Sequence, residues 1–187
     1  MLKKRLVIAT NNERKLEEFR KIFSQYKVLG LNDFDIEYEV EEDANTYYDN
    51  ALKKAREIFQ IIKCPVIADD SGLGIDKLNG FPGVLTHRWL GEDATDQERN
   101  DELIRNVSEE PARFTCVLVY YDGSNIQSGH GELVGKIASS PRGDNGFGFD
   151  SIFELPDGRT LAQLSPEEKN RLSARRLAAE DLAKKLR

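Results

Sequence analysis

The stretch Val66-Ile-Ala-Asp-Asp-Ser-Gly72 joins three apolar residues to two consecutive aspartates and a Ser-Gly pair. Its apolar part predicts a buried strand, so Asp69 and Asp70 are expected where that strand ends. Functional side chains of α/β sheets usually stand at such strand ends, whereas the alternative is that these aspartates only cap a loop. The glycine after Ser71 allows a ligand to approach the backbone closely. We therefore expect this strand to form part of a sheet and part of a site.

Helices and strands alternate on both sides of this stretch, as the spacing of the apolar residues indicates. Strands are expected at 6–9, 36–40, 66–68, 112–121, 126–137, 152–153 and 161–164, and helices at 13–23, 46–62, 95–107 and 166–186. The buried residues expected in the second and last helices are Tyr48, Ala51, Leu52, Ala55, Ile58, Phe59, Ile62, Leu177, Ala178, Leu182 and Leu186. Because βαβ units occur together with a hairpin, the sequence predicts an α/β protein with a mixed sheet and helices on its faces.

Length, charge and cysteine content set the broad class. The chain has 187 residues, so we expect a single domain over residues 1–187. Its net charge of −6 argues against nonspecific nucleic-acid binding, which depends on neutralising phosphates, but permits a small polyanionic ligand held by a few cations. Cys64 and Cys116 are expected to be free thiols, which favours the cytoplasm. No apolar stretch is long enough to predict a signal peptide or a membrane span.

The residues that follow the first expected strand are suited to binding phosphate. They are Thr10, Asn11, Asn12, Glu13, Arg14 and Lys15. A helix N-terminus offers unpaired backbone N–H groups and the positive end of the helix dipole, and Lys15 adds a positive charge. The glycines of a Walker loop are absent, so the alternative is an ordinary capped helix with a solvated lysine.

A second acidic pair, Glu41-Glu42, follows the strand expected at 36–40. Mg²⁺ prefers oxygen ligands and typically takes one or two carboxylates together with the phosphates of a substrate. Carboxylates from this pair and from Asp69 or Asp70, facing a cationic helix N-terminus, would form a site for a metal and a polyphosphate. The alternative is that the glutamates belong to a solvated turn.

The segment Gly146-Phe-Gly-Phe-Asp150 alternates glycine with phenylalanine before a carboxylate. Glycine leaves room for a flat ligand, a phenyl ring offers a stacking surface, and the aspartate can accept a hydrogen bond from a ring N–H. For this segment alone, the preferred interpretation is a twisted strand with both phenylalanines in the core. His87 and His130 are isolated, so no zinc site is expected. The cations that would by themselves form a solvated helix face are Lys169, Arg171, Arg175 and Arg176.

Five segments, taken in order, resemble those of one protein family. They are Ala9–Lys15; Glu41-Glu42 with Thr46 and Asn50-Ala51; Ala68–Leu73 continuing to Gly80–Gly83 and Arg88; Gly146–Asp150; and Glu168–Asn170 with Ser173–Arg175. On these motifs the chain is similar to the inosine/xanthosine triphosphate pyrophosphatases, also called the HAM1 family. The resemblance implies an elongated mixed β-sheet flanked by helices, two lobes with a central nucleotide cleft, and a homodimer.

The resemblance also implies roles for the matching residues. Asp70 and a glutamate of the pair Glu41-Glu42 would bind Mg²⁺, and Lys15 would assist the chemistry. Asp70 would accept the proton, and the alternatives are Asp69 and a metal-bound water. The residues implied to bind substrate are Thr10, Asn11, Asn12, Glu13, Arg14, Lys15, Ser71, Arg88, Phe147, Gly148, Phe149, Asp150, Lys169, Ala174 and Arg175.

The implied reaction is Mg²⁺-dependent hydrolysis of a deaminated purine nucleoside triphosphate (ITP, dITP or XTP) to the monophosphate and pyrophosphate. Ala174 stands where the family usually has a histidine that would contact the base. Phe149 and Ser151 replace the tyrosine and proline that the family usually has. Two alternative functions are a Maf-like pyrophosphatase acting on modified pyrimidine or 7-methylguanine nucleotides, and a nucleotide-binding module without turnover.

Overall fold

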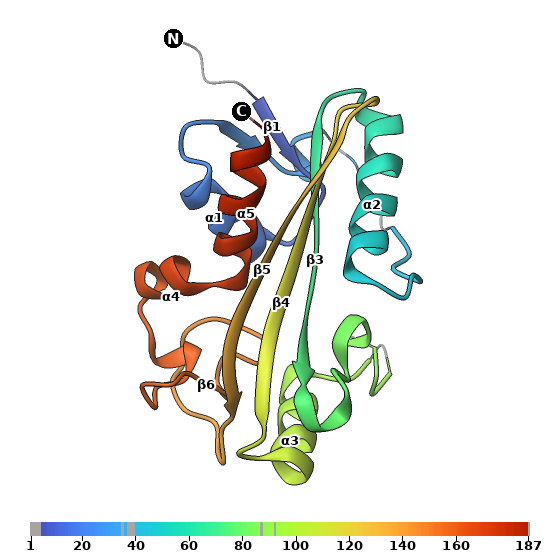
Figure 1. The fold of residues 1–187 in the computed structure, drawn as a ribbon. Coiled ribbons are helices and arrows are strands. Elements are labelled where there is room, and N and C mark those ends of the chain that lie inside the picture. Colours follow the sequence, from blue (N-terminus) through green and yellow to red (C-terminus); the bar gives the residue numbers. More distant parts are fainter. Residues whose placement is uncertain (1–4, 35, 37–39, 87, 92, 187) are drawn as a thin grey trace. The chain divides into compact units, whose positions relative to one another are not determined.

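A computed structural model describes residues 5–34, 36, 40–86, 88–91 and 93–186 of the chain (Figure 1). Its strands are β1 Arg5–Ile8, β2 Lys27–Leu29, β3 Val66–Ile75, β4 Pro111–Tyr121, β5 Ile126–Ile137 and β6 Phe153–Glu154. Its α-helices are α1 Glu13–Ile22, α2 Tyr47–Ile62, α3 Asp96–Val107, α4 Pro166–Leu172 and α5 Ala174–Lys185. Within the described ranges, none of these helices has the length and apolarity that a bilayer span requires.

The strands of the described chain form one six-stranded sheet in the order β2-β1-β3-β4-β5-β6. β1 is parallel to both of its neighbours, with Val7 opposite Val66 and Ile8 opposite Ile67 on β3. β5 and β6 pair antiparallel. The prediction of an α/β fold with a mixed sheet is therefore confirmed.

The chain divides into two compact units. The first unit comprises Met1–Asp70, Cys116–Gly131 and Arg175–Arg187, and the second comprises Ser71–Thr115 and Glu132–Ala174. Each of the long strands β3, β4 and β5 therefore contributes one part of its length to each unit.

In the first unit, helices cover both faces of the strands. Figure 1 shows α2 on one side and α1 with α5 on the other. The buried residues that form the core on the α2 side include Val7, Val66, Ala68, Val117 and Val119 from the strands and Ala51, Ala55 and Ile58 from the helix. The helix α5 lies so close to β5 that a Cβ at Gly129 would collide with the backbone of Ala178. Because side chains alternate along a strand, consecutive residues of β3 face different helices.

The second unit has its own core. Leu73 and Ile75 from β3 pack with Leu103 and Val107 from α3, and Phe153 of β6 belongs to the same buried cluster. A capping box fixes the start of α3, since the Thr95 side chain accepts from the backbone of Glu98 and the Glu98 side chain accepts in return. This helix is therefore fixed both at its first turn and along its buried face.

Two predicted strands differ from the observed structure. β3 does not end before the aspartates but continues to Ile75, because Leu73 and Ile75 are fully buried and this burial outweighs the weak strand propensity of Asp and Gly. Residues 161–164 are not a strand: Leu161–Gln163 form a 3₁₀ helix that begins with a capping box at Thr160. Of the strand predicted at 36–40, residues 37–39 lie outside the described residues.

The predicted C-terminal helix is two helices. Ser173 separates α4 from α5 with extended backbone angles (φ −61°, ψ 144°), a conformation that suits the residue before a helix. Three residues assigned to buried stripes are exposed, namely Tyr48, Leu177 and Leu186, with 37–39% of their surface accessible. The two cysteines are free, as predicted, although Cys64 is only partly buried.

Candidate functional site

Two groups of charged side chains contain most of the predicted site residues. The first group lies in the first unit and combines residues of β3, α1, α2 and α5 with Glu42. We call it the β3 cluster. The second group lies in the second unit and joins the segment Gly146–Asp150 to α4. We call it the aromatic loop.

Asp69 is the buried centre of the β3 cluster. Its side chain has no exposed surface, and its Oδ2 atom lies 3.1 Å from Lys15 Nζ and 3.5 Å from an Arg175 guanidinium nitrogen. Burial alone would raise the pKa of Asp69, but the neighbouring positive charges outweigh it and hold that pKa well below its ordinary value. Asp69 is therefore a permanent anion that fixes two cations.

Arg175 links Asp69 to a second acid. One guanidinium nitrogen donates to the carboxylate of Glu18, and the guanidinium lies 5.7 Å from the centre of the Phe19 ring. Both charged residues are buried, with 9% of each exposed. Burial would lower the pKa of Arg175, but Asp69 and Glu18 raise it, so the guanidinium remains charged. The network thus alternates in sign from Glu18 through Arg175 and Asp69 to Lys15.

Asp70, the next residue of β3, has a different environment. Its Oδ2 atom accepts a hydrogen bond of 2.9 Å from the side-chain amide of Asn50 on α2. Burial, together with the negative charge of Glu42, raises the pKa of Asp70 to about 6. The hydrogen bond from Asn50 and the charge of Lys54 lower this pKa by less than burial and Glu42 raise it, so ionisation of Asp70 is disfavoured, in contrast to that of Asp69.

Of the two predicted glutamates, Glu42 is the one that lies in the β3 cluster. Lys54 on α2 donates to the Glu42 carboxylate and, at 3.1 Å, to the backbone carbonyl of Asp69. Glu41 is exposed. Burial would lower the pKa of Lys54, but Asp69 and Glu42 raise it above its ordinary value. Lys54 therefore remains a cation and joins α2 to the strand.

The carboxylates of Asp70 and Glu42 suit a divalent cation. Among the described residues, no group of three or more His, Cys, Asp and Glu could hold a metal without other ligands. Mg²⁺ does not need such a group, because it usually takes one or two carboxylates and completes its coordination with water and substrate phosphates. Burial, which is the largest contribution, and the charge of Glu42 raise the pKa of Asp70, and a bound cation would offset the cost of its ionised form.

The start of α1 is a capped helix terminus. Asn12 Oδ1 accepts from the backbone N–H groups of Arg14 (3.1 Å) and Lys15 (3.2 Å), and Asn12 N–H donates to Thr10 Oγ1. Glu13 pairs with Arg20 on the surface. Two of the N–H groups predicted to bind phosphate are therefore already hydrogen-bonded to Asn12, while Lys15 points to Asp69.

The aromatic loop is not the twisted strand that the segment alone suggested. It is a series of turns in which Gly146 and Gly148 have positive φ angles of 84° and 61°. Asp150 Oδ2 accepts from Lys169 Nζ at 2.7 Å and from the backbone N–H of Phe147 at 2.8 Å. Lys169 Nζ lies 4.7 Å from the centre of the Phe147 ring. Only Phe149 is in the core, so Phe147 is the aromatic surface beside a cation.

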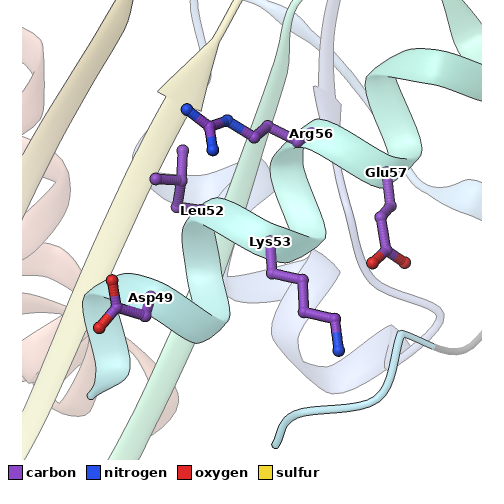
Figure 2. A pocket seen from close by; sticks show the side chains of 5 residues that line it. All are labelled: Asp49, Leu52, Lys53, Arg56 and Glu57. Carbon is purple, nitrogen blue, oxygen red and sulfur yellow. The ribbon is translucent and has the colours of Figure 1, made fainter. Parts of the chain in front are cut away.

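The remaining predicted residues lie elsewhere in the second unit. Ser71 is half-buried on β3, Arg88 is half-buried in the turn after residues 83–86, and Ala174 is buried at the start of α5. A surface hollow on α2 includes none of the predicted site residues. Figure 2 shows that the five side chains that line it project from this single helix. They are Asp49, Leu52, Lys53, Arg56 and Glu57.

Five residues that stabilise one or the other of these groups received no role from the sequence, although Asn50 was part of a quoted motif. They are Glu18, Asn50, Lys54, Asp96 and Asn100. For two of them a signal was present, since Asn50 and Lys54 are polar residues one helical turn apart and therefore lie on the same side of α2. Glu18 carried no such signal, because it looks like one of many charged residues on an amphipathic helix.

The fold and the two groups together define a class: an α/β protein with a buried array of carboxylates and cations on a mixed sheet and, in its second unit, an aromatic ring beside a lysine. Comparison with known proteins makes this specific. Residues 6–185 match the model of the Ham1 family. The chain belongs to the Ham1 family, and the resemblance seen in its motifs is confirmed.

Relatives match over nearly the whole chain. A dITP/XTP pyrophosphatase of Geobacillus kaustophilus is 42% identical over 181 residues, which cover 92% of this chain and 89% of that protein. The structure of the Staphylococcus aureus Ham1 protein is 37% identical with a TM-score of 0.86, covering 98% of both chains. The structure of a HAM1 protein from Coxiella burnetii is 36% identical with a TM-score of 0.88, covering 100% of this chain and 98% of the other.

Proposed function

We propose that this chain hydrolyses deaminated purine nucleoside triphosphates such as dITP, ITP and XTP, releasing the monophosphate and pyrophosphate. The names of its relatives support this substrate class, since the Geobacillus kaustophilus protein is a dITP/XTP pyrophosphatase. The observation in this chain that carries the proposal is the contrast between Asp69 and Asp70. Asp69 lies 3.1 Å from Lys15 and 3.5 Å from Arg175. Asp70 instead accepts from the neutral amide of Asn50, and burial and Glu42 disfavour its ionised form.

Asp70 and Glu42 would hold the divalent metal, which we propose is Mg²⁺, and the bound metal would neutralise charge on the triphosphate. Burial raises the pKa of Asp70 to about 6 in the metal-free protein, but a bound cation would lower that pKa again, so we assign Asp70 chiefly to holding the metal. Asp69 has a depressed pKa and no exposed surface. We therefore assign Asp69 the role of an anchor that fixes Lys15, and Lys15 the role of stabilising negative charge on the phosphates.

The aromatic loop would recognise the base. A purine ring can stack on Phe147, and Lys169 can donate to a carbonyl oxygen. Hypoxanthine and xanthine carry this oxygen at C6, where adenine carries an amine that cannot accept from a lysine. A mismatched buried polar pair costs about 1–3 kcal/mol, which would favour the deaminated bases. The nitrogens of Arg175 that form hydrogen bonds are directed to Glu18 and Asp69, so we assign Arg175 to the β3 cluster.

We also propose that residues 1–187 form one pyrophosphatase domain that acts in the cytoplasm as a homodimer. The homodimer rests on the resemblance to the family, the single domain on the length of the chain and the cytoplasm on its free cysteines. Light scattering of the purified chain tests the dimer.

The central test measures pyrophosphate release from dITP, XTP, ITP, dATP, dGTP and dCTP, each with Mg²⁺ and with excess EDTA. We expect rapid release from the first three, little from dATP, whose base carries an amine at C6, and none with EDTA. The dGTP result measures whether the 2-amino group of guanine is also rejected. Asp70→Asn should fold, because the substitution is nearly isosteric, and should lose nearly all kcat. Full activity in EDTA would refute the metal assignment, and wild-type turnover by Asp70→Asn would remove Asp70 from the catalytic residues.

The same panel separates the alternatives. Release from 7-methylguanosine or modified pyrimidine triphosphates, with none from dITP, would favour a Maf-like activity. Tight binding of dITP without any release would favour a nucleotide-binding module.

A further inference from the structure

The aromatic loop is only partly secured by its own residues, through the hydrogen bond from the N–H of Phe147 to Asp150. Gly146 and Gly148 have positive φ angles, and residues 144–151 form bends and turns without strand pairing. Glycine loses more conformational freedom on ordering than any other residue. An aromatic ring carried between two such glycines needs additional contacts if it is to hold one position.

Helix α3 supplies contacts to both backbone groups of Gly148. The N–H of Gly148 donates to Asp96 Oδ2 at 3.0 Å, and its carbonyl oxygen accepts from Asn100 Nδ2 at 3.0 Å. Asn100 is also 3.4 Å from Ser151 Oγ, just beyond the loop. Asp96 and Asn100 are four residues apart, so they lie one above the other on the same side of the helix.

The position of α3, which contacts Gly148, is itself fixed by the fold. Its first turn is fixed by the capping box of Thr95 and Glu98, and its buried face packs through Leu103 and Val107 into the core of the second unit. Asn100 itself is 7% exposed. Gly148 is therefore held by side chains whose own positions are fixed by the fold.

Holding Gly148 in place also restricts the position of the neighbouring Phe147 ring. The two residues share a peptide bond, and the N–H of Phe147 is fixed on the other side by Asp150, which also binds Lys169. The Phe147 ring then lies beside Lys169 Nζ. Space next to Gly148 is open, since a Cβ placed there would meet nothing within 4 Å. A flat ligand can therefore approach this part of the backbone.

We infer that Asp96 and Asn100 are positioning residues for base recognition: they clamp Gly148 and thereby hold Phe147 beside Lys169 in the arrangement that a purine meets. This inference rests on the proposed function, because it assumes that the aromatic loop binds the base. Neither residue touches the substrate. Their effect is on how well the loop is ordered before binding, since ordering a loop during binding weakens affinity.

The principal test compares Asp96→Ala with Asp101→Ala. Asp101 is an exposed acid on the same helix, so this control loses the same charge without touching the loop. Asp96→Ala should speed hydrogen exchange at the Gly148 amide and raise KM for dITP about threefold to tenfold, with kcat changed by less than about twofold. The preference for dITP over dATP in kcat/KM should fall by a similar factor, because a loosely held ring and lysine discriminate less.

A rescue variant separates the hydrogen bond from the charge. Asp96 also lies 3.5 Å from Arg99, so its removal alters an ion pair as well. Asp96→Asn removes the charge but keeps an oxygen that can accept from Gly148, and it should restore KM to near the wild-type value. Asn100→Ala should reproduce the effect of Asp96→Ala, and thermal unfolding checks that it is folded. Because the side chain of Asp96 is 54% exposed, Asp96→Ala is the decisive variant if Asn100→Ala does not fold.

The outcomes distinguish this inference from the proposed function. If Phe147→Ala raises KM while Asp96→Ala behaves like Asp101→Ala in KM and in Gly148 exchange, the positioning role is overturned and the base site stands. If the wild-type protein releases no pyrophosphate from dITP or XTP, the proposed function is overturned, and the assignment of these residues to base recognition falls with it.

Discussion

Identical substitutions at two adjacent residues should change stability in opposite directions. Asp70→Asn should stabilise the metal-free protein at pH 8, and Asp69→Asn should destabilise it. Both residues lie in the middle of β3 with at most 5% of their surface exposed, so neither burial nor strand position distinguishes them. What differs is the charge around each carboxylate, which is positive at Asp69 and includes Glu42 at Asp70.

The magnitude at Asp70 follows from its pKa. Folding raises this pKa from 3.8 to about 6, so the folded state binds the proton more tightly than the unfolded state does. Stability is therefore lost as the pH rises from about 4 to about 6, and the loss remains in full above that range. At about 1.4 kcal/mol per pKa unit, the ionised Asp70 costs up to about 3 kcal/mol at pH 8. Asparagine is neutral at every pH and removes this cost, so the gain should fall below about 1 kcal/mol near pH 4.

The sign is reversed at Asp69. Its pKa is lowered in the folded state, so it contributes stability at neutral pH that is lost as the pH falls. Asparagine at this position leaves Lys15 and Arg175 without their shared counter-ion. Removing one partner from a buried ion pair typically costs about 3–5 kcal/mol.

Urea unfolding of the three proteins measures both effects. The curves are recorded in EDTA at pH 8 and near pH 4, and the midpoints are compared at equal m-values. Added Mg²⁺ should stabilise the wild-type protein more than Asp70→Asn, since a ligand that binds only the folded state raises its stability. If Asp70→Asn were destabilised at pH 8 as strongly as Asp69→Asn, the charge environments described for β3 would be wrong.

Three further predictions concern the metal and the base. Glu42→Gln should raise the Mg²⁺ concentration needed for half-maximal pyrophosphate release by about tenfold, while Glu41→Gln should leave it unchanged; equal effects would contradict the choice of Glu42. Lys169→Met should lower the dITP-over-dATP ratio of kcat/KM about tenfold or more, with the exposed Lys184→Met as control, and an unchanged ratio would exclude Lys169 from base discrimination. Ala174→His should raise the ITP-over-ATP ratio by up to about tenfold with a smaller change in kcat for ITP, and an equal gain from Ala174→Leu would show that volume rather than an imidazole hydrogen bond is responsible.

The parts of the fold that were predictable from sequence are those set by neighbouring residues. The starts of α2 and α3 follow Thr46 and Thr95, whose side chains accept from the backbone N–H groups of Asp49 and Glu98, and this pattern is legible without any tertiary information. β2 spans only Lys27–Leu29 and pairs with β1. Because this pairing is what forms the strand, the local sequence does not predict it. The division at Ser173 likewise interrupts a continuous run of helix-forming residues.

In the site, too, the residues were predictable from the sequence but their different environments were not. The motif containing Asp69 and Asp70 was visible in the sequence, but two adjacent aspartates look equivalent while the strand is thought to end there. Their roles separate only because β3 continues to Ile75, since a continuing strand sends consecutive side chains to opposite faces. One carboxylate then meets cations from α1 and α5, and the other meets Asn50 of α2 and the charge of Glu42. The continuation itself depends on the burial of Leu73 and Ile75 in a different unit of the chain. The chemical difference between the two neighbouring aspartates thus depends on the burial of Leu73 and Ile75, and a motif of residue types does not show which core those apolar side chains enter.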